Sequence, residues 1–220
     1  MERRLTRQGR ARKAELLRHA ADLFAERGYE ETRVIDIVRA AGVAKGLFYW
    51  YFDNKEALFR NLITDTRRRL RRVQADAVAG IESPLAQLHA ATRASVGFMS
   101  EHRHLYALMQ IEGRAATAFT DEVRATSAVH AADTAALIAA GQRAGEIRTD
   151  DTPATLAHGL LATVLHMVYF HRTGRLDMPV DELAASVARL VTRGLAADND
   201  AARRAEQPVH AAPAAAAGSA

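Results

Sequence analysis

Residues 42–59 carry two lysines and a run of aromatic residues that could contact a polyanion. Three adjacent aromatics, Tyr49 to Tyr51, lie between Lys45 and Lys55. Ammonium and hydroxyl groups bind phosphate, and aromatic or apolar side chains contact base edges and thymine methyl groups. The segment therefore has the chemistry for contact with a nucleic acid, provided that a helix presents these side chains on one free face.

The helical period divides this segment into a packed face and a free face. On a helix that begins at Lys45, about 100° per residue brings Phe48 and Phe52 together. The opposite face carries Gly46, Leu47 and Trp50. This pattern predicts a recognition helix in a DNA major groove, where Gly46 permits close approach. A surface helix with one isolated tryptophan is the alternative.

Apolar residues at helical spacing predict two further helices before this segment. A short helix follows Thr32, its expected N-cap, and ends at Gly42, which is free to take the left-handed conformation. A longer helix spans about Gln8 to Arg27. Two short helices joined around a glycine are typical of a helix-turn-helix.

Residues 10–72 resemble the DNA-binding domain of TetR-family transcriptional regulators. The matching stretches are Leu23 to Tyr29, Thr32 to Ile37, Ala40 to Gly46, Phe48 to Phe52, and Asn54 to Leu58. The resemblance implies DNA contacts at Thr32, Arg33, Ala44, Lys45, Gly46, Leu47, Tyr49, Trp50 and Lys55. The family often has Ser or Thr at positions 44 and 47 and a smaller residue at position 50. The operator sequence therefore does not follow from the resemblance.

Composition limits the class of protein. The chain has 220 residues, 49% hydrophobic and 25% charged, which is typical of a globular protein, and it has no cysteine for a disulfide or a thiolate metal site. Residues 1–72 hold 18 Lys and Arg against 10 Asp and Glu, a net charge of +8, and the remainder has a net charge of −4. A basic end on an acidic body suits a polyanion partner, and uneven surface charge without a partner is the alternative.

No segment has the pattern of a targeting signal or of a membrane-spanning helix. The N-terminus is rich in arginine without an apolar stretch, which argues against a signal peptide. The most apolar stretch, Leu160 to Phe170, is shorter than a bilayer requires. We therefore expect a cytoplasmic protein without a membrane partner.

Two arginine clusters need separate interpretations. Residues 1–9 form a basic N-terminal arm that either follows the DNA backbone and minor groove or stays solvated. The second cluster, residues 67–72, lies about 21 Å along its helix from the DNA-proximal end. We interpret it mainly as a solvated face that points away from DNA.

The remaining sequence predicts an all-α body over residues 73–198. Asp53, with Glu56 three positions later, is the expected cap of a helix that continues to about Val78. Further helices are expected over residues 84–99, 104–112, 119–143, 153–171 and 181–197, two of which follow a Ser-Pro or Thr-Pro pair. Residues 199–220 are rich in alanine with almost no large apolar side chain, and we expect a disordered tail.

The helix after Pro153 is apolar nearly all round, so both of its sides must be covered. A second copy of the chain could cover one side through a four-helix interface. The expected interface residues are Leu156, Leu160, Val164, Met167, Leu183, Val187, Leu190 and Val191. A monomer with a buried central helix is the alternative.

The resemblance also implies a small-molecule effector that binds within the body and changes DNA binding. Candidate lining residues are Phe98, Met99, Tyr106, Met109, Phe119, His166, Tyr169 and Phe170, each of which could instead be ordinary core.

No catalytic motif is present, and the spacings of the histidine pairs 102/104 and 158/166 do not suit a shared metal ion, so we expect no enzyme, cofactor or metal site. A ligand-responsive repressor that binds a palindromic operator as a homodimer is the favoured function. A membrane-surface or scaffold protein with a basic arm is the alternative.

Overall fold

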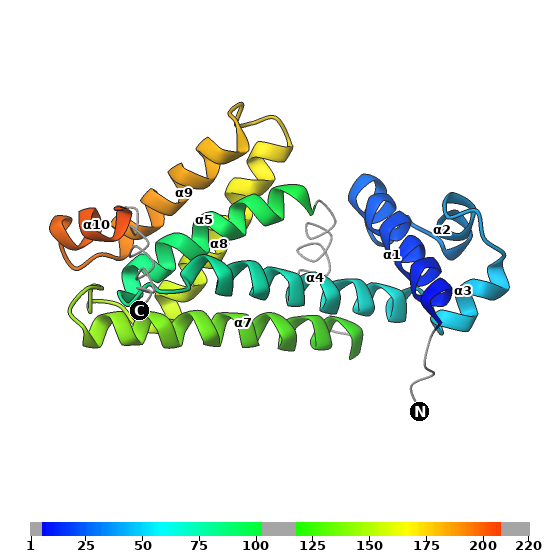
Figure 1. Ribbon diagram of the computed structural model, residues 1–220, viewed down its shortest axis with the longest axis horizontal. Coiled ribbons are helices and arrows are strands. Elements are labelled where there is room, and N and C mark those ends of the chain that lie inside the picture. Colours follow the sequence, from blue (N-terminus) through cyan, green and yellow to red (C-terminus); the bar gives the residue numbers. More distant parts are fainter. Residues whose placement is uncertain (1–5, 103–117, 208–220) are drawn as a thin grey trace, which may run out of the picture.

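Helices joined by turns and short loops make up the described part of the protein (Figure 1). The computed structural model describes residues 6–102 and 118–207. The helices are α1 (Arg7–Arg27), α2 (Val34–Ala40), α3 (Lys45–Tyr51), α4 (Lys55–Val78), α5 (Pro84–Glu101), α7 (Ala118–Arg143), α8 (Pro153–Arg172), α9 (Val180–Leu195) and α10 (Asn199–Glu206). Within the described ranges the only β-type pairing is an isolated bridge between Ile147 and Ala196. The predicted all-α fold is confirmed.

The head comprises α1, α2, α3 and the first half of α4, which surround a small apolar core. Three aromatic rings form its centre. Phe59 packs edge-on against Phe24 at 5.2 Å and lies 4.9 Å from Tyr29. Burial, followed by the charge of Glu56, raises the pKa of the Tyr29 hydroxyl. Because these rings come from α1, the following turn and α4, they join the start of α4 to the helix-turn-helix.

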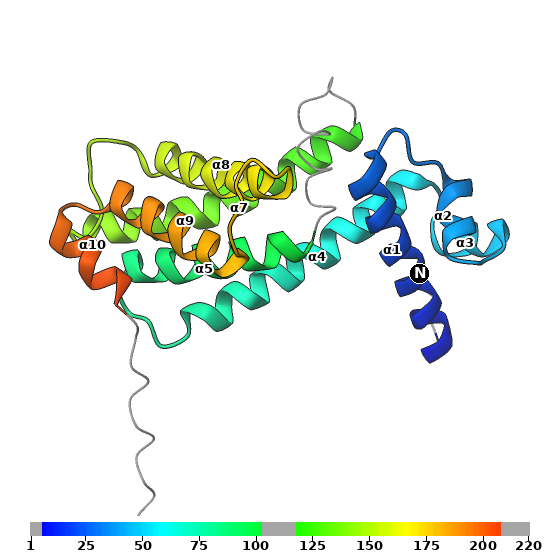
Figure 2. The same cartoon turned by 90° about the horizontal axis from the view of Figure 1, so that it is seen from above.

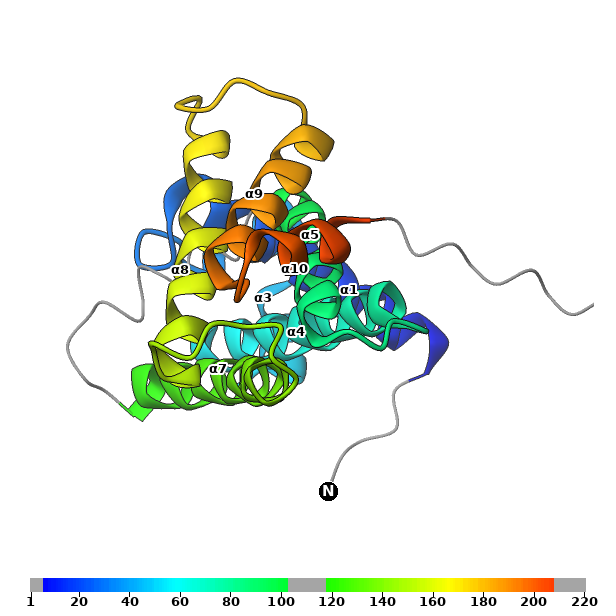
Figure 3. The same ribbon diagram turned by 90° about the vertical axis from the view of Figure 1, so that its left-hand side faces the viewer.

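The described part of the body comprises the second half of α4 and helices α5, α7, α8, α9 and α10. Helix α5 lies between α4 and α9, and α8 packs against α7 (Figures 2 and 3). Its core is separate from that of the head and includes Leu85, Val96, Ile138, Leu156, Leu160, Leu183 and Val187. Helix α4 contributes side chains to the head core and packs against α5 of the body, so it connects the two parts.

Polar N-caps at two helix starts lie where the sequence predicts them. The hydroxyls of Ser83 and Thr152 accept hydrogen bonds from the backbone amides of Ala86 and Thr155, each at 3.1 Å. Gly42 has φ +63° and ends the α2 turn in the expected left-handed conformation. The expected helix over residues 104–112 lies outside the described residues.

Two predicted caps are wrong by one residue. Asn54, and not Asp53, caps α4, because its Oδ1 accepts a hydrogen bond from the amide of Ala57 at 2.7 Å. Arg33, and not Thr32, stands at the N-cap of α2. At the start of each helix two adjacent residues could act as the N-cap, and the geometry of the turn determines which of them does.

The prediction of disorder from residue 199 is wrong for its first part, because residues 199–206 form α10. Asp198 caps this helix through a 2.6 Å hydrogen bond from the amide of Ala201. The buried face consists of Ala201, Ala202 and Ala205. Helix α10 packs on α5 and α9, and Arg193 donates to both oxygens of Glu206 at 2.8 and 3.1 Å. Small side chains allow close backbone approach, so little apolar bulk is needed to hold this helix.

Helix α8 is long and apolar enough to cross a membrane by length and composition, whereas the sequence prediction considered only its stretch from Leu160 to Phe170. It packs against α5, α7 and α9, and its buried side chains belong to the body core. Core helices of soluble proteins can have the same length and apolar composition. We therefore interpret α8 as a core helix with one free face.

Candidate nucleic-acid interface and ligand pocket

Helix α3 has one packed face and one free face, as its sequence predicts. Phe48 and Phe52 are buried in the head core, with ring centroids 5.7 Å apart. Tyr49 and Trp50 are each 48% exposed. Trp50 is the chain's only tryptophan, and the Tyr51 ring meets it edge-on at 4.6 Å. Large aromatic side chains are therefore held in place on the surface of a short helix, where they could contact base edges.

Polar and small residues border these aromatics. Lys45 is exposed, and its ammonium lies 5.8 Å from the centroid of the Tyr49 ring. Ala44 is exposed and Leu47 is half-buried. A Cβ added at Gly46 would meet nothing within 4 Å, so packing within the chain does not require glycine there. Because glycine costs about 1 kcal/mol relative to alanine inside a helix, its presence favours a requirement for close approach from outside.

The structure contradicts a phosphate contact by the side chain of Thr32. This residue is 0% exposed, and its hydroxyl donates to the carbonyl oxygens of Gly28 at 2.8 Å and Leu23 at 3.3 Å. Thr32 thus joins the end of α1 to the start of α2. The neighbouring Arg33 does remain at the surface, where it forms a 3.2 Å ion pair with Asp36 and lowers the pKa of that carboxyl.

Lys55 is also engaged within the head. Its ammonium donates to the carbonyl oxygens of Tyr29 at 2.7 Å and Glu30 at 3.3 Å, and it lies 4.2 Å from the centroid of the Tyr29 ring. These contacts tie the start of α4 to the α1–α2 turn. The geometry therefore favours a structural role for Lys55 over the expected phosphate contact.

We expect Lys55→Met to destabilise the head by about 1–3 kcal/mol, because two carbonyl groups lose a charged donor. Urea unfolding followed by Trp50 fluorescence measures this change. Lys45→Met is the matched control: it should leave stability unchanged and reduce the salt dependence of DNA binding by about one ion per subunit. A Lys55→Met variant that kept its stability and lost salt dependence would restore the phosphate role.

The expected basic arm over residues 1–9 is partly wrong, because α1 begins at Arg7 and Thr6 caps it. The side chains of Arg7, Arg10 and Arg12 are exposed on this helix. Lys13 instead donates to Asn61 Oδ1 at 3.0 Å and lies 5.4 Å from the centroid of the Phe52 ring. The basic residues described here are thus carried by a capped helix, and residues 1–5 lie outside the described part.

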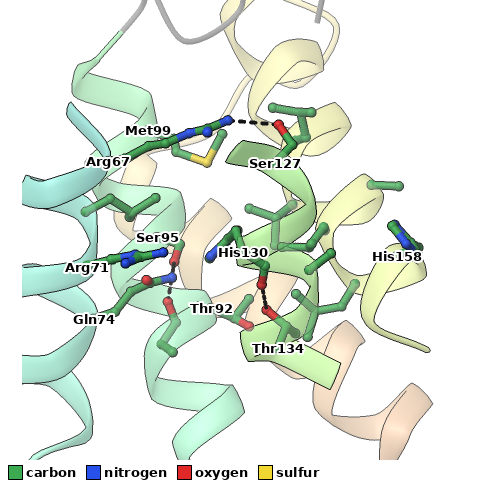
Figure 4. A pocket seen from close by; sticks show the side chains of 18 of the residues that line it. Arg67, Arg71, Gln74, Thr92, Ser95, Met99, Ser127, His130, Thr134 and His158 are labelled. Carbon is green, nitrogen blue, oxygen red and sulfur yellow. Dashed lines mark hydrogen bonds between the residues drawn. The ribbon is translucent and has the colours of Figure 1, made fainter. Parts of the chain in front are cut away.

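A cavity of about 480 Å³ lies in the body between α4, α5, α7 and α8 (Figure 4). Its lining includes Arg67, Arg71, Gln74, Leu88, Thr92, Ser95, Met99, Ser127, His130, Thr134, His158, Leu160, Leu161, Val164 and Leu165. The volume lies within the roughly 300–1,000 Å³ of small-molecule sites. Helix α4 contributes one wall, so the same helix contacts both the cavity and the head.

Most of the expected ligand residues lie elsewhere. Met99 lines the cavity, whereas Phe98 is buried and stacks on the His102 ring at 3.9 Å. His166 is exposed on α8. Tyr169 and Phe170 are half-buried near the end of α8, where Arg175 lies within 6.0 Å of each ring centroid. The expected residues Tyr106 and Met109 and the side chain of Phe119 fall outside the described part. The sequence prediction missed Arg67 and His130, which line the cavity from α4 and α7, because nothing in the sequence indicates that these two helices face it together.

The expected interface residues are also mostly wrong, because they form the core of a single chain. Leu156, Leu160, Val164, Leu183, Val187 and Val191 are all buried without any partner chain. Met167 is half-buried, and Leu190 is 56% exposed. The free face of α8 instead presents Thr155, His158, Gly159, Ala162 and His166, of which His158 and Ala162 also line the cavity. An apolar pattern identifies buried residues but does not tell whether their neighbours belong to the same chain.

Among the described residues, no group of three His, Cys, Asp or Glu side chains could hold a metal ion. The absence of a metal site, a cofactor and catalytic residues stays a prediction.

The fold and site define a class: an all-α protein with a helix-turn-helix head, a free recognition-type helix and a helical body around a cavity. Residues 16–62 match the family model for bacterial regulatory proteins of the tetR family. Residues 82–195 match the model for the tetracyclin repressor-like C-terminal domain. The second match alone covers more than half of the chain, and the protein belongs to the TetR family.

Individual relatives agree with this assignment. The HTH-type transcriptional repressor KstR2 of Rhodococcus jostii is 36% identical over 107 residues, which cover 44% of this chain and 52% of that protein. The match thus spans about half the length of this curated relative. A TetR-like transcriptional regulator from Rhodococcus sp. RHA1 superposes with a TM-score of 0.68 at 25% identity, covering 87% of this chain and 98% of the other. FadR of Bacillus subtilis, solved with stearoyl-CoA, has a TM-score of 0.70 at 20% identity and covers 82% and 98%.

Proposed function

We propose that this protein is a sequence-specific DNA-binding transcriptional regulator that represses its target genes as a homodimer. The observation that carries the proposal is the free face of α3, where Tyr49 and Trp50 are exposed although Phe48 beside them is fully buried. The open space at Gly46 supports it, and so does the name of the KstR2 relative, a repressor. Such a protein acts where the chromosome lies, so we expect it in the cytoplasm.

Binding to the DNA upstream of its own gene tests this proposal. A footprint and a mobility-shift series between 50 and 200 mM salt are expected to show one protected pseudo-palindrome and affinity that falls steeply with salt. Unrelated duplexes of equal length should bind at least about 1,000-fold more weakly. Equal affinity for every duplex and for anionic vesicles would favour the membrane-surface or scaffold alternative.

We propose that the dimer forms through the free face of α8 together with the neighbouring exposed part of α9. The centre of this face of α8 carries small residues. Gly159 and Ala162 are three positions apart and therefore adjacent on the helix surface. Leu190 on α9 adds a large exposed apolar side chain. Small residues permit close helix approach, as a four-helix interface requires. Two heads could then reach successive major grooves about 34–36 Å apart.

Gly159→Arg should convert the dimer into a monomer without unfolding the chain. A Cβ at this position would meet nothing within 4 Å, so a single chain tolerates the change, whereas a partner helix does not. Sedimentation velocity at micromolar concentration should show a species of 24.0 kDa instead of one twice that mass. Ala75→Arg, at an exposed position of α4, adds the same side chain and should remain dimeric. A dimeric Gly159→Arg protein would place the interface elsewhere.

We further propose that a small molecule in the body cavity controls DNA binding. The FadR structure with stearoyl-CoA supports this proposal at the level of the fold. Here α4 lines the cavity with Arg67 and Arg71 and reaches the head at Lys55. A ligand that shifts α4 therefore acts on the head through one continuous helix. Mobility shifts in the presence of candidate ligands test this coupling.

A further inference from the structure

Helix α3 and its N-cap lack the side chains that read bases through hydrogen bonds matched to a base edge. From Ala44 to Tyr51 the sequence contains no Arg, Asn, Gln, Ser, Thr, Asp or Glu. These residue types supply the contacts to guanine, adenine and cytosine in the major groove. Lys45 is the only charged residue in this range, and its ammonium is a point charge on a flexible stem. Other exposed groups of α3 must therefore distinguish the base pairs.

The free face of α3 offers apolar surface instead. Ala44 is exposed, Leu47 is half-buried and Trp50 is 48% exposed. Successive members of this set are three positions apart and therefore adjacent on the helix surface. The open space at Gly46 lets the backbone come close to the bases, so that even short side chains can reach them. In the major groove the apolar group of a base is the 5-methyl group of thymine.

A series of ring contacts holds Trp50 in place on this face. The Trp50 and Tyr51 rings lie 4.6 Å apart with an interplanar angle of 87°. Tyr51 packs against the head core and lies 6.3 Å from the ring of the buried Phe52. A side chain that is already ordered loses little conformational freedom on binding. Trp50 can therefore select for the position of a methyl group and not only for apolar surface in general.

We propose that α3 identifies its operator mainly through the 5-methyl groups of thymine, which Trp50 and Leu47 contact. This inference rests on the DNA-binding function proposed above and names the chemical feature that the same face recognises. Contacts from Lys45 to phosphate add affinity without identifying a base. Adenine, guanine and cytosine have no methyl group in the major groove, so only T·A pairs satisfy these contacts. Recognition of DNA shape is a different mode, which needs no methyl group.

Replacement of thymine by deoxyuridine tests this inference, because it removes the methyl group and keeps every base-pairing hydrogen bond. The probe is the tightest-binding duplex that the full chain selects from a pool with a randomised centre of about 30 base pairs, which accommodates two half-sites one helical turn apart. Each protected thymine is replaced in turn, symmetrically in both half-sites. We expect at least one such pair of replacements to lower affinity by about 10- to 20-fold, since each buried methyl group contributes about four-fold.

Two further measurements assign the effect to the methyl group and to α3. At a sensitive position, 5-methylcytosine should bind more tightly than cytosine, because it restores the methyl group. Trp50→Ala and Leu47→Ala, compared with wild-type protein at low salt, should each lose the deoxyuridine effect at one sensitive thymine. Val129→Ala removes exposed apolar surface from α7 and should retain the full effect. Circular dichroism confirms that each variant is folded.

The outcomes separate this inference from the proposed function. A selected duplex whose affinity no deoxyuridine replacement changes would overturn the inference and leave specific DNA binding standing. An equal deoxyuridine effect in wild-type protein, Trp50→Ala and Leu47→Ala would also overturn it, because the methyl groups would then act without α3. Failure to select any duplex would reject the proposed function and this inference together.

Discussion

Trp50→Ala is expected to reduce operator affinity by at least about 100-fold while changing stability by less than about 1.5 kcal/mol. The side chain is 48% exposed, and its described ring contact is with Tyr51 beside it. Its loss therefore removes little packing. At an interface, a central tryptophan is typical of the residues that dominate binding, and a dimer loses two of them. Mobility-shift titrations and thermal unfolding by circular dichroism measure the two quantities.

Val129→Ala provides the control for loss of an exposed apolar side chain. Val129 is 49% exposed on α7, a helix of the body that lies apart from α3 in Figure 1. Its substitution should leave operator affinity unchanged. Trp50→Phe retains an aromatic face and should recover part of the binding. Unchanged affinity in Trp50→Ala would mean that the free face of α3 does not contact base pairs.

Phe59→Ala is expected to destabilise the head by about 3–5 kcal/mol, the usual cost of removing a buried aromatic ring. Phe59 is 0% exposed and contacts both Phe24 and Tyr29 at the centre of the head. The body has a separate core, to which Phe59 does not belong. Urea should therefore shift the Trp50 fluorescence transition to lower concentration and leave a later helical transition, observed by circular dichroism, in place.

Ile138→Ala gives the reverse test, because Ile138 is 0% exposed in the body core. This change should lower the later transition and leave the Trp50 transition nearly unchanged. A single coincident transition in both variants would show that the two cores unfold together. We expect two transitions instead, because the buried residues of the head and of the body form separate clusters.

Helix positions could be read from the sequence because local signals determine them. The Ser-Pro and Thr-Pro pairs at residues 83–84 and 152–153 mark two helix starts, and glycines mark several ends. The two faces of α3 also followed from spacing alone, since Phe48 and Phe52 are four positions apart in the sequence. The position of an N-cap was harder to predict where two suitable residues are adjacent, as at residues 53–54.

Features that depend on contacts between distant residues could not be read in the same way. Periodicity identified Leu156 and Val187 as buried, but their neighbours belong to the same chain and not to a second copy. Lys55 carried the charge expected of a phosphate ligand, yet the carbonyl oxygens of the α1–α2 turn accept its hydrogen bonds. Arg67 was grouped with its exposed neighbours, although one position along a helix is enough to turn a side chain into the cavity.

The separation of the two cores has a genetic consequence. A subunit whose head is damaged, for example at Phe59, would still have intact α8 and α9 helices, through which we propose that the subunits pair. In a cell that also makes normal protein, mixed pairs would then carry a single working head and engage only one half-site. Alleles that damage the head should consequently be dominant over the normal gene, whereas alleles that prevent pairing should be recessive.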